Sequence, residues 1–124
     1  MTEKRFSREH IWIEKIGSRT YRIGLTPFAI ERLGEVIAVE LPVKGERVQA
    51  GQAIGTVETA KTVTDLYAPL NGLVSEINLR LMEEPDLLNR NPLDQGWVAV
   101  LESSDSAALW SNEEYDTFVK GESK

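Results

Sequence analysis

Apolar residues alternate with polar ones over short segments along most of this chain, and turn residues separate the segments. This period of two is typical of β-strands with one buried face. The first pair of segments, Ile11 to Ile16 and Thr20 to Leu25, flanks a three-residue loop that begins with Gly17. Short loops containing glycine favour hairpins. We therefore expect the chain to begin its core with a β-hairpin.

The same pattern continues to about residue 101 and predicts a mostly β fold. Turn residues such as Gly45, Gly51 and Gly72 keep the expected strands short and closely spaced. Such a series is typical of a flattened β-barrel or sandwich. The further strands are expected at Val36 to Leu41, around Val48, and at Ile54 to Thr59, Thr62 to Tyr67, Leu73 to Ile77 and Trp97 to Leu101.

Small helices are expected at three places. Thr26 can cap a helix that starts at Pro27, because proline lacks the N–H that would be unpaired there, and Gly34 can end it. Between Leu79 and Asn89, where Pro85 interrupts the pattern, we expect a helical turn and a loop packed on the sheet.

The third helical place is the C-terminal segment, at about 104–120. Ser104 to Trp110 and Ser111 to Lys120 are expected as two helices, and Ser111 has capping-box spacing to Glu114. Tyr115 begins an apolar face that should dock on the body of the protein.

Length, charge and composition exclude several classes of function. A chain of 124 residues suggests a single domain over 1–124. Its net charge of −6 opposes binding to nucleic acid, and neither a membrane span nor a signal-peptide core is present, so a cytoplasmic location is expected. The absence of cysteine and a single histidine exclude disulfides, thiolate metal sites and a zinc cluster. Redox chemistry would therefore need an attached cofactor.

Lys61 lies at the centre of the most informative stretch, an expected hairpin at about 54–67. Segments rich in valine and threonine flank it, and small neighbours leave its amine accessible. A lysine in a turn is, by itself, most often simply solvated.

The residues around Lys61 resemble the lipoyl-lysine loop of the glycine cleavage system H protein. The resemblance rests on Val57-Glu58-Thr59-Ala60-Lys61-Thr62 and Asp65-Leu66-Tyr67-Ala68-Pro69-Leu70-Asn71-Gly72, with Glu9-His10-Ile11-Trp12, Gly24-Leu25-Thr26, Leu41-Pro42 and Gly96-Trp97 in the family's order. It extends from about Phe6 to Phe118. Biotin carriers are similar to a pattern with methionine beside the lysine, which Ala60 and Thr62 do not fit.

This resemblance implies a lipoyl carrier of the hybrid-motif fold, with lipoate attached covalently to Lys61 by a lipoate ligase. Such a carrier is expected to be a monomer and not an enzyme, with no catalytic residue of its own. The resemblance also implies a cleft into which the arm folds back, which we place at Ile11, Phe28 and Asp65. Glu58 is expected to help the lipoylating enzyme recognise its lysine.

Two positions in the expected cleft differ from the usual H-protein pattern. H proteins usually have a glutamate where this chain has Ile11 and a histidine where it has Phe28. An apolar cleft suits a sulfur-bearing arm better than a charged amine, so the sequence favours an H-like lipoate-binding protein of sulfur oxidation that works with a heterodisulfide-reductase-like complex.

Two alternatives remain open at this point. The first is glycine cleavage, in which the arm carries an aminomethyl group between glycine decarboxylase and aminomethyltransferase. For either carrier, dihydrolipoyl dehydrogenase is the expected partner that reoxidises the arm. The second alternative is an unlipoylated binding or regulatory module that kept the fold.

Overall fold

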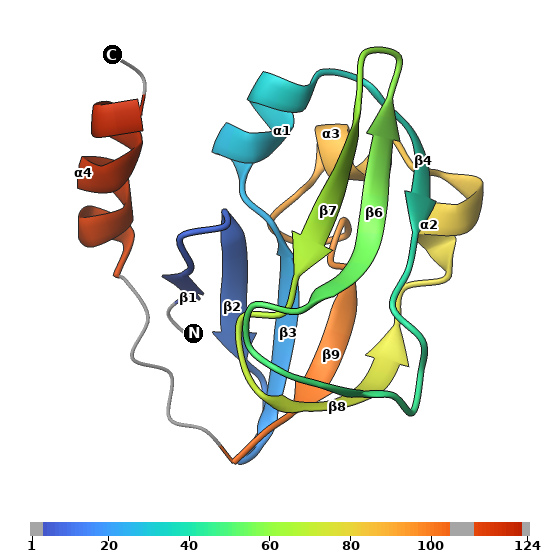
Figure 1. The fold of residues 1–124 in the computed structure, drawn as a ribbon, viewed down its shortest axis with the longest axis vertical. Coiled ribbons are helices and arrows are strands. Elements are labelled where there is room, and N and C mark those ends of the chain that lie inside the picture. The colour runs from blue at the N-terminus through green and yellow to red at the C-terminus, as the bar shows by residue number, and fades with distance from the viewer. Residues whose placement is uncertain (1–3, 105–110, 123–124) are drawn as a thin grey trace.

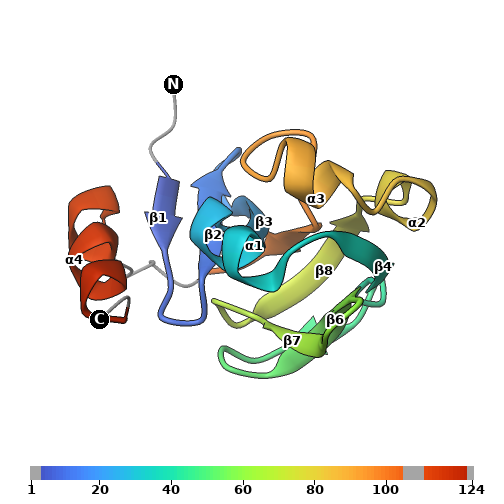
Figure 2. The ribbon, with the colours of Figure 1, turned by 90° about the horizontal axis from the view of Figure 1, so that it is seen from above.

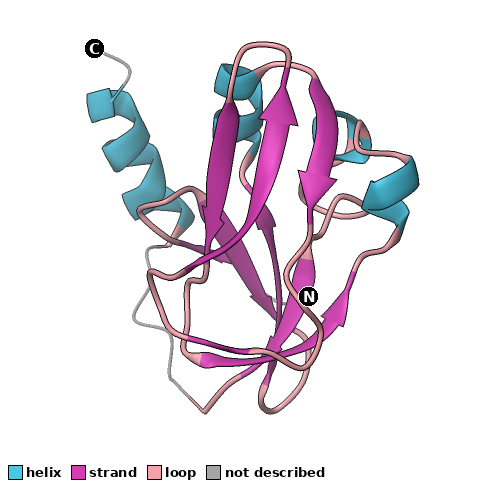
Figure 3. Ribbon diagram, turned by 45° about the vertical axis from the view of Figure 1, so that its right-hand side comes forward, coloured by secondary structure: helices cyan, strands magenta, loops and turns pink. Residues whose placement is uncertain are grey.

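Two antiparallel β-sheets pack against each other in the computed structural model, which describes residues 4–104 and 111–122 (Figure 1). The larger sheet has six strands, in the order β1 (Lys4–Phe6), β2 (Ile11–Lys15), β3 (Thr20–Leu25), β9 (Ala99–Glu102), β8 (Gly72–Ile77) and β5 (Arg47–Val48). The smaller sheet has three, in the order β4 (Val36–Glu40), β6 (Ala53–Thr59) and β7 (Val63–Tyr67). The predicted fold class, mostly β with two layers and short helices, is confirmed (Figure 3).

One apolar core joins the two sheets. Ile13 and Ile23 from the larger sheet and Val57 and Leu66 from the smaller one belong to the same buried cluster, and none is more than 2% exposed. Burying each such side chain contributes about 1.5–3 kcal/mol to stability. The core therefore anchors the lower part of the β6–β7 hairpin, while its tip projects beyond the sheets (Figure 1).

The chain begins with a strand that the sequence did not predict. β1 has only three residues, two of them charged, so it is too short to show the alternation of apolar and polar residues that predicts a strand. It forms because Phe6 pairs with Trp12 on β2 and packs in a second buried cluster with Tyr115. In the middle of the large sheet, between β3 and β8, β9 begins at Ala99, two residues later than predicted.

The helix α1 (Pro27–Leu33) has the predicted ends. The Oγ1 atom of Thr26 accepts a hydrogen bond from the N–H of Ala29 at 3.3 Å, and Gly34 follows the helix with φ of 87°. Asn89 braces this end, because its side chain donates to the carbonyl of Gly34 and accepts from the N–H of Val36, both at 2.9 Å. A helix this short is marginal alone, so these contacts fix its place.

Two further short helices cover one edge of the core. The segment expected to hold a helical turn and a loop contains α2 (Arg80–Glu83) and α3 (Leu87–Arg90). Exposed ion pairs join them, and hydrogen bonds from Arg80 and then Arg90 lower the pKa of Glu84. Among the described helices, none is both long and apolar enough to cross a membrane.

The C-terminal helix α4 (Asn112–Glu122) lies beside β1 at one side of the molecule (Figure 2). Its predicted capping box is confirmed: Glu114 accepts from the N–H of Ser111 at 2.9 Å, and Ser111 Oγ accepts from the N–H of Glu114 at 3.3 Å. The backbone N–H of Ser111 thereby lowers the pKa of Glu114. The predicted docking through Tyr115 is confirmed by its 4% exposure. The other predicted helix lies outside the described residues, except for Ser104, which is not helical.

Gly24 provides a test of how tightly the second cluster is packed. A Cβ atom there would come within 2.7 Å of the Trp12 ring, which is fully buried and donates its Nε1–H to the carbonyl of Pro92 at 2.8 Å. We therefore expect Gly24→Ala to lower the free energy of unfolding by about 1–3 kcal/mol, measured by urea denaturation. Gly121→Ala, on the exposed part of α4, is the matched control and should change stability by less than ~1 kcal/mol. Equal midpoints for wild type and Gly24→Ala would contradict a fixed Trp12 ring.

Candidate functional site

Lys61 lies in the tight turn at the tip of the β6–β7 hairpin (Figure 1). One side-chain hydroxyl braces this turn, because Thr59 Oγ1 accepts from the N–H of Lys61 at 3.2 Å and from the N–H of Thr62 at 3.3 Å. The N–H of Thr59 also donates to the carbonyl of Thr62 at 2.9 Å. Thr59 is only 5% exposed, whereas Lys61 is exposed. The amine of Lys61 is thus presented on a braced turn.

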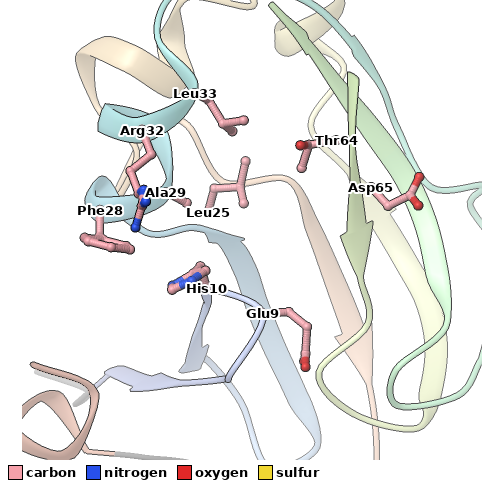
Figure 4. Close-up of a pocket in the computed structure, with 9 residues that line it drawn as sticks. All are labelled: Glu9, His10, Leu25, Phe28, Ala29, Arg32, Leu33, Thr64 and Asp65. Atoms are coloured by element: carbon pink, nitrogen blue, oxygen red, sulfur yellow. The ribbon is translucent and has the colours of Figure 1, made fainter. Parts of the chain in front are cut away.

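An open cleft of about 370 Å³ lies beside this hairpin, between β7 and α1 (Figure 4). Its walls come from the turn before β2, the end of β3, one face of α1 and the middle of β7. The lining residues are Glu9, His10, Leu25, Phe28, Ala29, Arg32, Leu33, Thr64 and Asp65. Most of the wall is apolar, and the charged groups belong to its exposed residues.

The two cleft residues of β7 point in opposite directions. In Figure 4 the side chain of Thr64 points toward Leu25 and Leu33, whereas that of Asp65 lies on the other side of the strand. Successive side chains of a strand alternate between its faces, so Asp65 shares the outer face with Tyr67, whose hydroxyl donates to it at 3.5 Å. Asp65 therefore lies at the rim of the cleft, and Thr64, which the sequence did not indicate, faces its interior.

Ile11 does not lie where the sequence placed it. Its side chain is 2% exposed and packs in the main core with Ile23 and Leu66, and it does not line the cleft. The cleft instead receives Glu9 and His10, the two residues before it. His10 has φ of 66°, so the backbone turns just before β2 begins and directs these side chains differently from the strand. No local signal in the residues predicts this turn, since a positive φ is uncommon for residues other than glycine.

The other predicted site residues lie on different sides of the hairpin and cleft. Phe28 lies in the cleft wall, with its ring centroid 5.1 Å from that of His10 and 5.3 Å from the guanidinium of Arg32. Glu58 pairs with Val63 across the hairpin and is exposed. It lies near Lys61 and is not among the cleft residues.

Lys61 and the cleft are close along β7. Thr64 is three residues from Lys61, which corresponds to about 10 Å along an extended strand. A lysine stem extended by an acyl chain can therefore turn back from the tip into the cleft. In chemical terms, the arrangement offers an accessible amine for acylation and an apolar wall with charged groups around it.

Comparisons with known proteins find relatives of similar sequence and fold. Residues 4–122 match the family model described as glycine cleavage H-protein. The glycine cleavage system H protein of Listeria welshimeri is 43% identical over 114 residues, which cover 90% of each chain. That of Bacillus licheniformis is 40% identical over 121 residues, covering 95% of this chain and 94% of the relative. The crystal structure of the H protein from Mycobacterium marinum matches with a TM-score of 0.87 at 31% identity, covering 95% of this chain and 97% of the other.

The bracing of the Lys61 turn can be tested on the unmodified protein. Thr59→Val removes the oxygen that accepts from the N–H groups of Lys61 and Thr62 while keeping the shape of the side chain. We expect hydrogen exchange at these two amides to become about three- to tenfold faster, the range for the net free energy of one hydrogen bond. Thr59→Ser keeps the oxygen and should exchange at nearly the wild-type rate. Identical rates in all three proteins would show that the hydroxyl does not hold the turn.

Proposed function

The chain belongs to the glycine cleavage H-protein family, and from this we propose that it is a lipoyl carrier of glycine cleavage, with the lipoyl group on Lys61. The family resemblance predicted from the sequence is thereby confirmed, and members of the family carry lipoate covalently on a lysine. In this proposal the chain catalyses no step and is a substrate for its partners. These are a lipoate ligase, a glycine decarboxylase, an aminomethyltransferase and a dihydrolipoyl dehydrogenase.

The placement of Lys61 is the observation that carries this proposal. A ligase must hold the lysine in its own active site, and an exposed amine on a projecting, hydrogen-bonded turn can enter without unfolding of the carrier. When attached, lipoate supplies a disulfide that accepts two electrons together with the aminomethyl group of glycine. The chain itself supplies reach, a fixed starting point for the arm and a local concentration at each partner.

The cleft fits the two ends of such an arm. Leu25 and Phe28 offer apolar surface to a neutral dithiolane and its acyl chain, whose burial contributes about 25 cal/mol per Å². An amine carried on the arm needs a negative partner, and Glu9 is a carboxylate among the cleft residues, with Asp65 at the rim. The positive charge of Arg32 repels such an amine. Its guanidinium, however, lies over the Phe28 ring. Carboxylates this exposed attract an ammonium only modestly, by up to about 1 kcal/mol.

The physical argument by which the sequence favoured a sulfur-oxidation carrier does not hold for the cleft as it is built. That preference assumed that Ile11 and Phe28 leave the cleft with one carboxylate, but Ile11 lies in the core and Glu9 lines the cleft. The similar proteins of Listeria welshimeri, Bacillus licheniformis and Mycobacterium marinum are named as H proteins of the glycine cleavage system, and they give no support to a heterodisulfide-reductase-like partner. Replacing Ile11 by glutamate would not rebuild a cleft, because it would bury an unpaired carboxylate at a cost of several kcal/mol.

Lipoylation at Lys61 is tested by intact mass. Coexpression with a lipoate ligase should add one lipoyl group to the wild type and none to Lys61→Arg, because arginine keeps the charge but offers no amine that the ligase can acylate. Lys44→Arg, at another exposed turn, is the matched control and should be modified like the wild type. Lipoylation of Lys61→Arg would exclude this assignment, and an unmodified wild type would favour the binding or regulatory module.

The pathway is tested by glycine–bicarbonate exchange with a glycine decarboxylase. We expect lipoylated wild type to support exchange and the Lys61→Arg protein to support none. Glu9→Gln should shorten the lifetime of the aminomethyl-loaded protein by about two- to fivefold at low salt and less at high salt, because exposed charges are screened.

Glu83→Gln, which removes an exposed carboxylate from α2, is the control for the change in net charge. It should leave the lifetime unchanged. If the lipoylated wild type supports no exchange, the proposal that the chain is a glycine cleavage carrier is wrong.

A further inference from the structure

Tyr115 connects the C-terminal helix to the wall of the cleft. Its hydroxyl oxygen lies 2.6 Å from Nδ1 of His10 and 2.7 Å from Oγ1 of Thr26. The side chain is 4% exposed, and its ring stacks on that of Phe6 with centroids 4.9 Å apart and an interplanar angle of 14°. One buried hydroxyl on α4 thus meets two residues that lie about 90 and 105 positions earlier in the chain.

One of these partners, His10, lines the cleft opposite β7, and the other, Thr26, caps the helix that forms the next part of the wall. His10 lines the cleft from the turn before β2, and the carbonyl and Oγ of Ser7 hold that turn by accepting from the N–H groups of His10 at 3.1 Å and Ile11 at 3.2 Å. Thr26 caps α1, the helix that carries Phe28, and its N–H donates to the carbonyl of His10 at 3.0 Å. The Tyr115 hydroxyl therefore joins the turn and the start of the helix.

The burial of Thr26 gives these hydrogen bonds a direction. Thr26 is 0% exposed, and its Oγ1 already accepts from the N–H of Ala29, so its own hydrogen needs an acceptor. The Tyr115 oxygen is such an acceptor at 2.7 Å, and its own hydroxyl hydrogen can then be donated to Nδ1 of His10, 2.6 Å away. The chain of donors runs from Ala29 through Thr26 and Tyr115 to His10. A neutral imidazole that accepts at Nδ1 in this way carries its proton on Nε2.

Aromatic contacts hold the same imidazole on several sides. Its centroid lies 5.1 Å from that of Phe28, 5.6 Å from Tyr115 and 5.8 Å from Phe118. Two of these three rings come from α4 and one from the cleft wall. If the His10 imidazole rotated so that Nδ1 no longer faced the Tyr115 hydroxyl, its packing against all three aromatic rings would change.

We propose that Tyr115 is a positioning residue for the cleft: its hydroxyl holds the His10 imidazole in one tautomer and one orientation, and so keeps the wall in the shape that receives the arm. In this proposal the C-terminal helix α4 contributes to the shape of the cleft through Tyr115. The part of this inference that concerns the arm rests on the proposed lipoyl function. The part that concerns His10 does not.

His10 is the only histidine in the chain, so nitrogen NMR of the unmodified protein reports on it without assignment work. In alkaline buffer, the wild type should show one protonated and one unprotonated ring nitrogen. Tyr115→Phe keeps the ring stacked on Phe6 but removes the hydroxyl, and its two nitrogen signals should move toward each other as the tautomers mix. Thr117→Val, an exposed change on the same helix, should give the wild-type spectrum.

A second pair of variants tests the same chain of donors from the other end. Thr26→Ser keeps the hydroxyl and should keep the wild-type imidazole spectrum, whereas Thr26→Val removes it and should resemble Tyr115→Phe. This pair decides the inference even if Tyr115→Phe folds poorly. Identical imidazole spectra in the wild type and in both hydroxyl-deleting variants would overturn it.

The link to the cleft has its own readout in lipoylated protein. Tyr115→Phe should be lipoylated like the wild type, but its aminomethyl cargo should be lost about three- to tenfold faster, the range for one lost hydrogen bond. A changed imidazole spectrum with an unchanged rate of loss would overturn the role in the cleft. Failure of the wild type to accept lipoate or cargo would instead count against the proposed function, and the imidazole spectra would still decide the role of Tyr115.

Discussion

The two-faced character of β7 is the constraint on which the site depends. Leu66 on its inner face is 1% exposed and belongs to the core that joins both sheets, so the strand can neither rotate nor slip by one residue without exposing it. That fixed register turns Thr64 toward the cleft and leaves Asp65 on the outer face. It also fixes where the hairpin ends, and hence where Lys61 projects. Burial at the base of the hairpin thus determines the position of Lys61 at its tip.

The opposite side of the cleft depends on short elements that support one another. The helix α1 has seven residues and cannot be stable by itself, so its place is set by the cap at Thr26 and the brace from Asn89. The turn at His10 adopts a backbone conformation that histidine seldom takes, and hydrogen bonds to Ser7 hold it there. Tyr115 joins both, so the cleft wall, α1 and α4 are physically one unit.

The chemistry of the cleft is decided by the side chains that point into it. A position next to a sequence motif does not by itself place a residue there. Ile11 follows the motif histidine directly, yet its side chain contributes to core stability, while Glu9 contributes the carboxylate. The cleft combines an apolar wall with two carboxylates, Glu9 and Asp65, and one cation, Arg32, which lies over the Phe28 ring. The comparisons place the chain in the glycine cleavage H-protein family, whose members carry lipoate on a lysine.

Much of this protein could be predicted from its sequence because the signals are local. Alternation, turn residues and caps predict most of the strands, the ends of α1 and the capping box of α4, and the ordered motifs indicate the family and Lys61. The three-residue β1, the core position of Ile11 and the outward side chain of Asp65 were not predictable in this way. Each depends on long-range contacts: β1 exists because β2 and Tyr115 cover it, and the cleft exists because a turn with positive φ brings Glu9 and His10 opposite β7. A sequence specifies which residues alternate, but only packing between distant segments decides which face of each becomes the wall of a site.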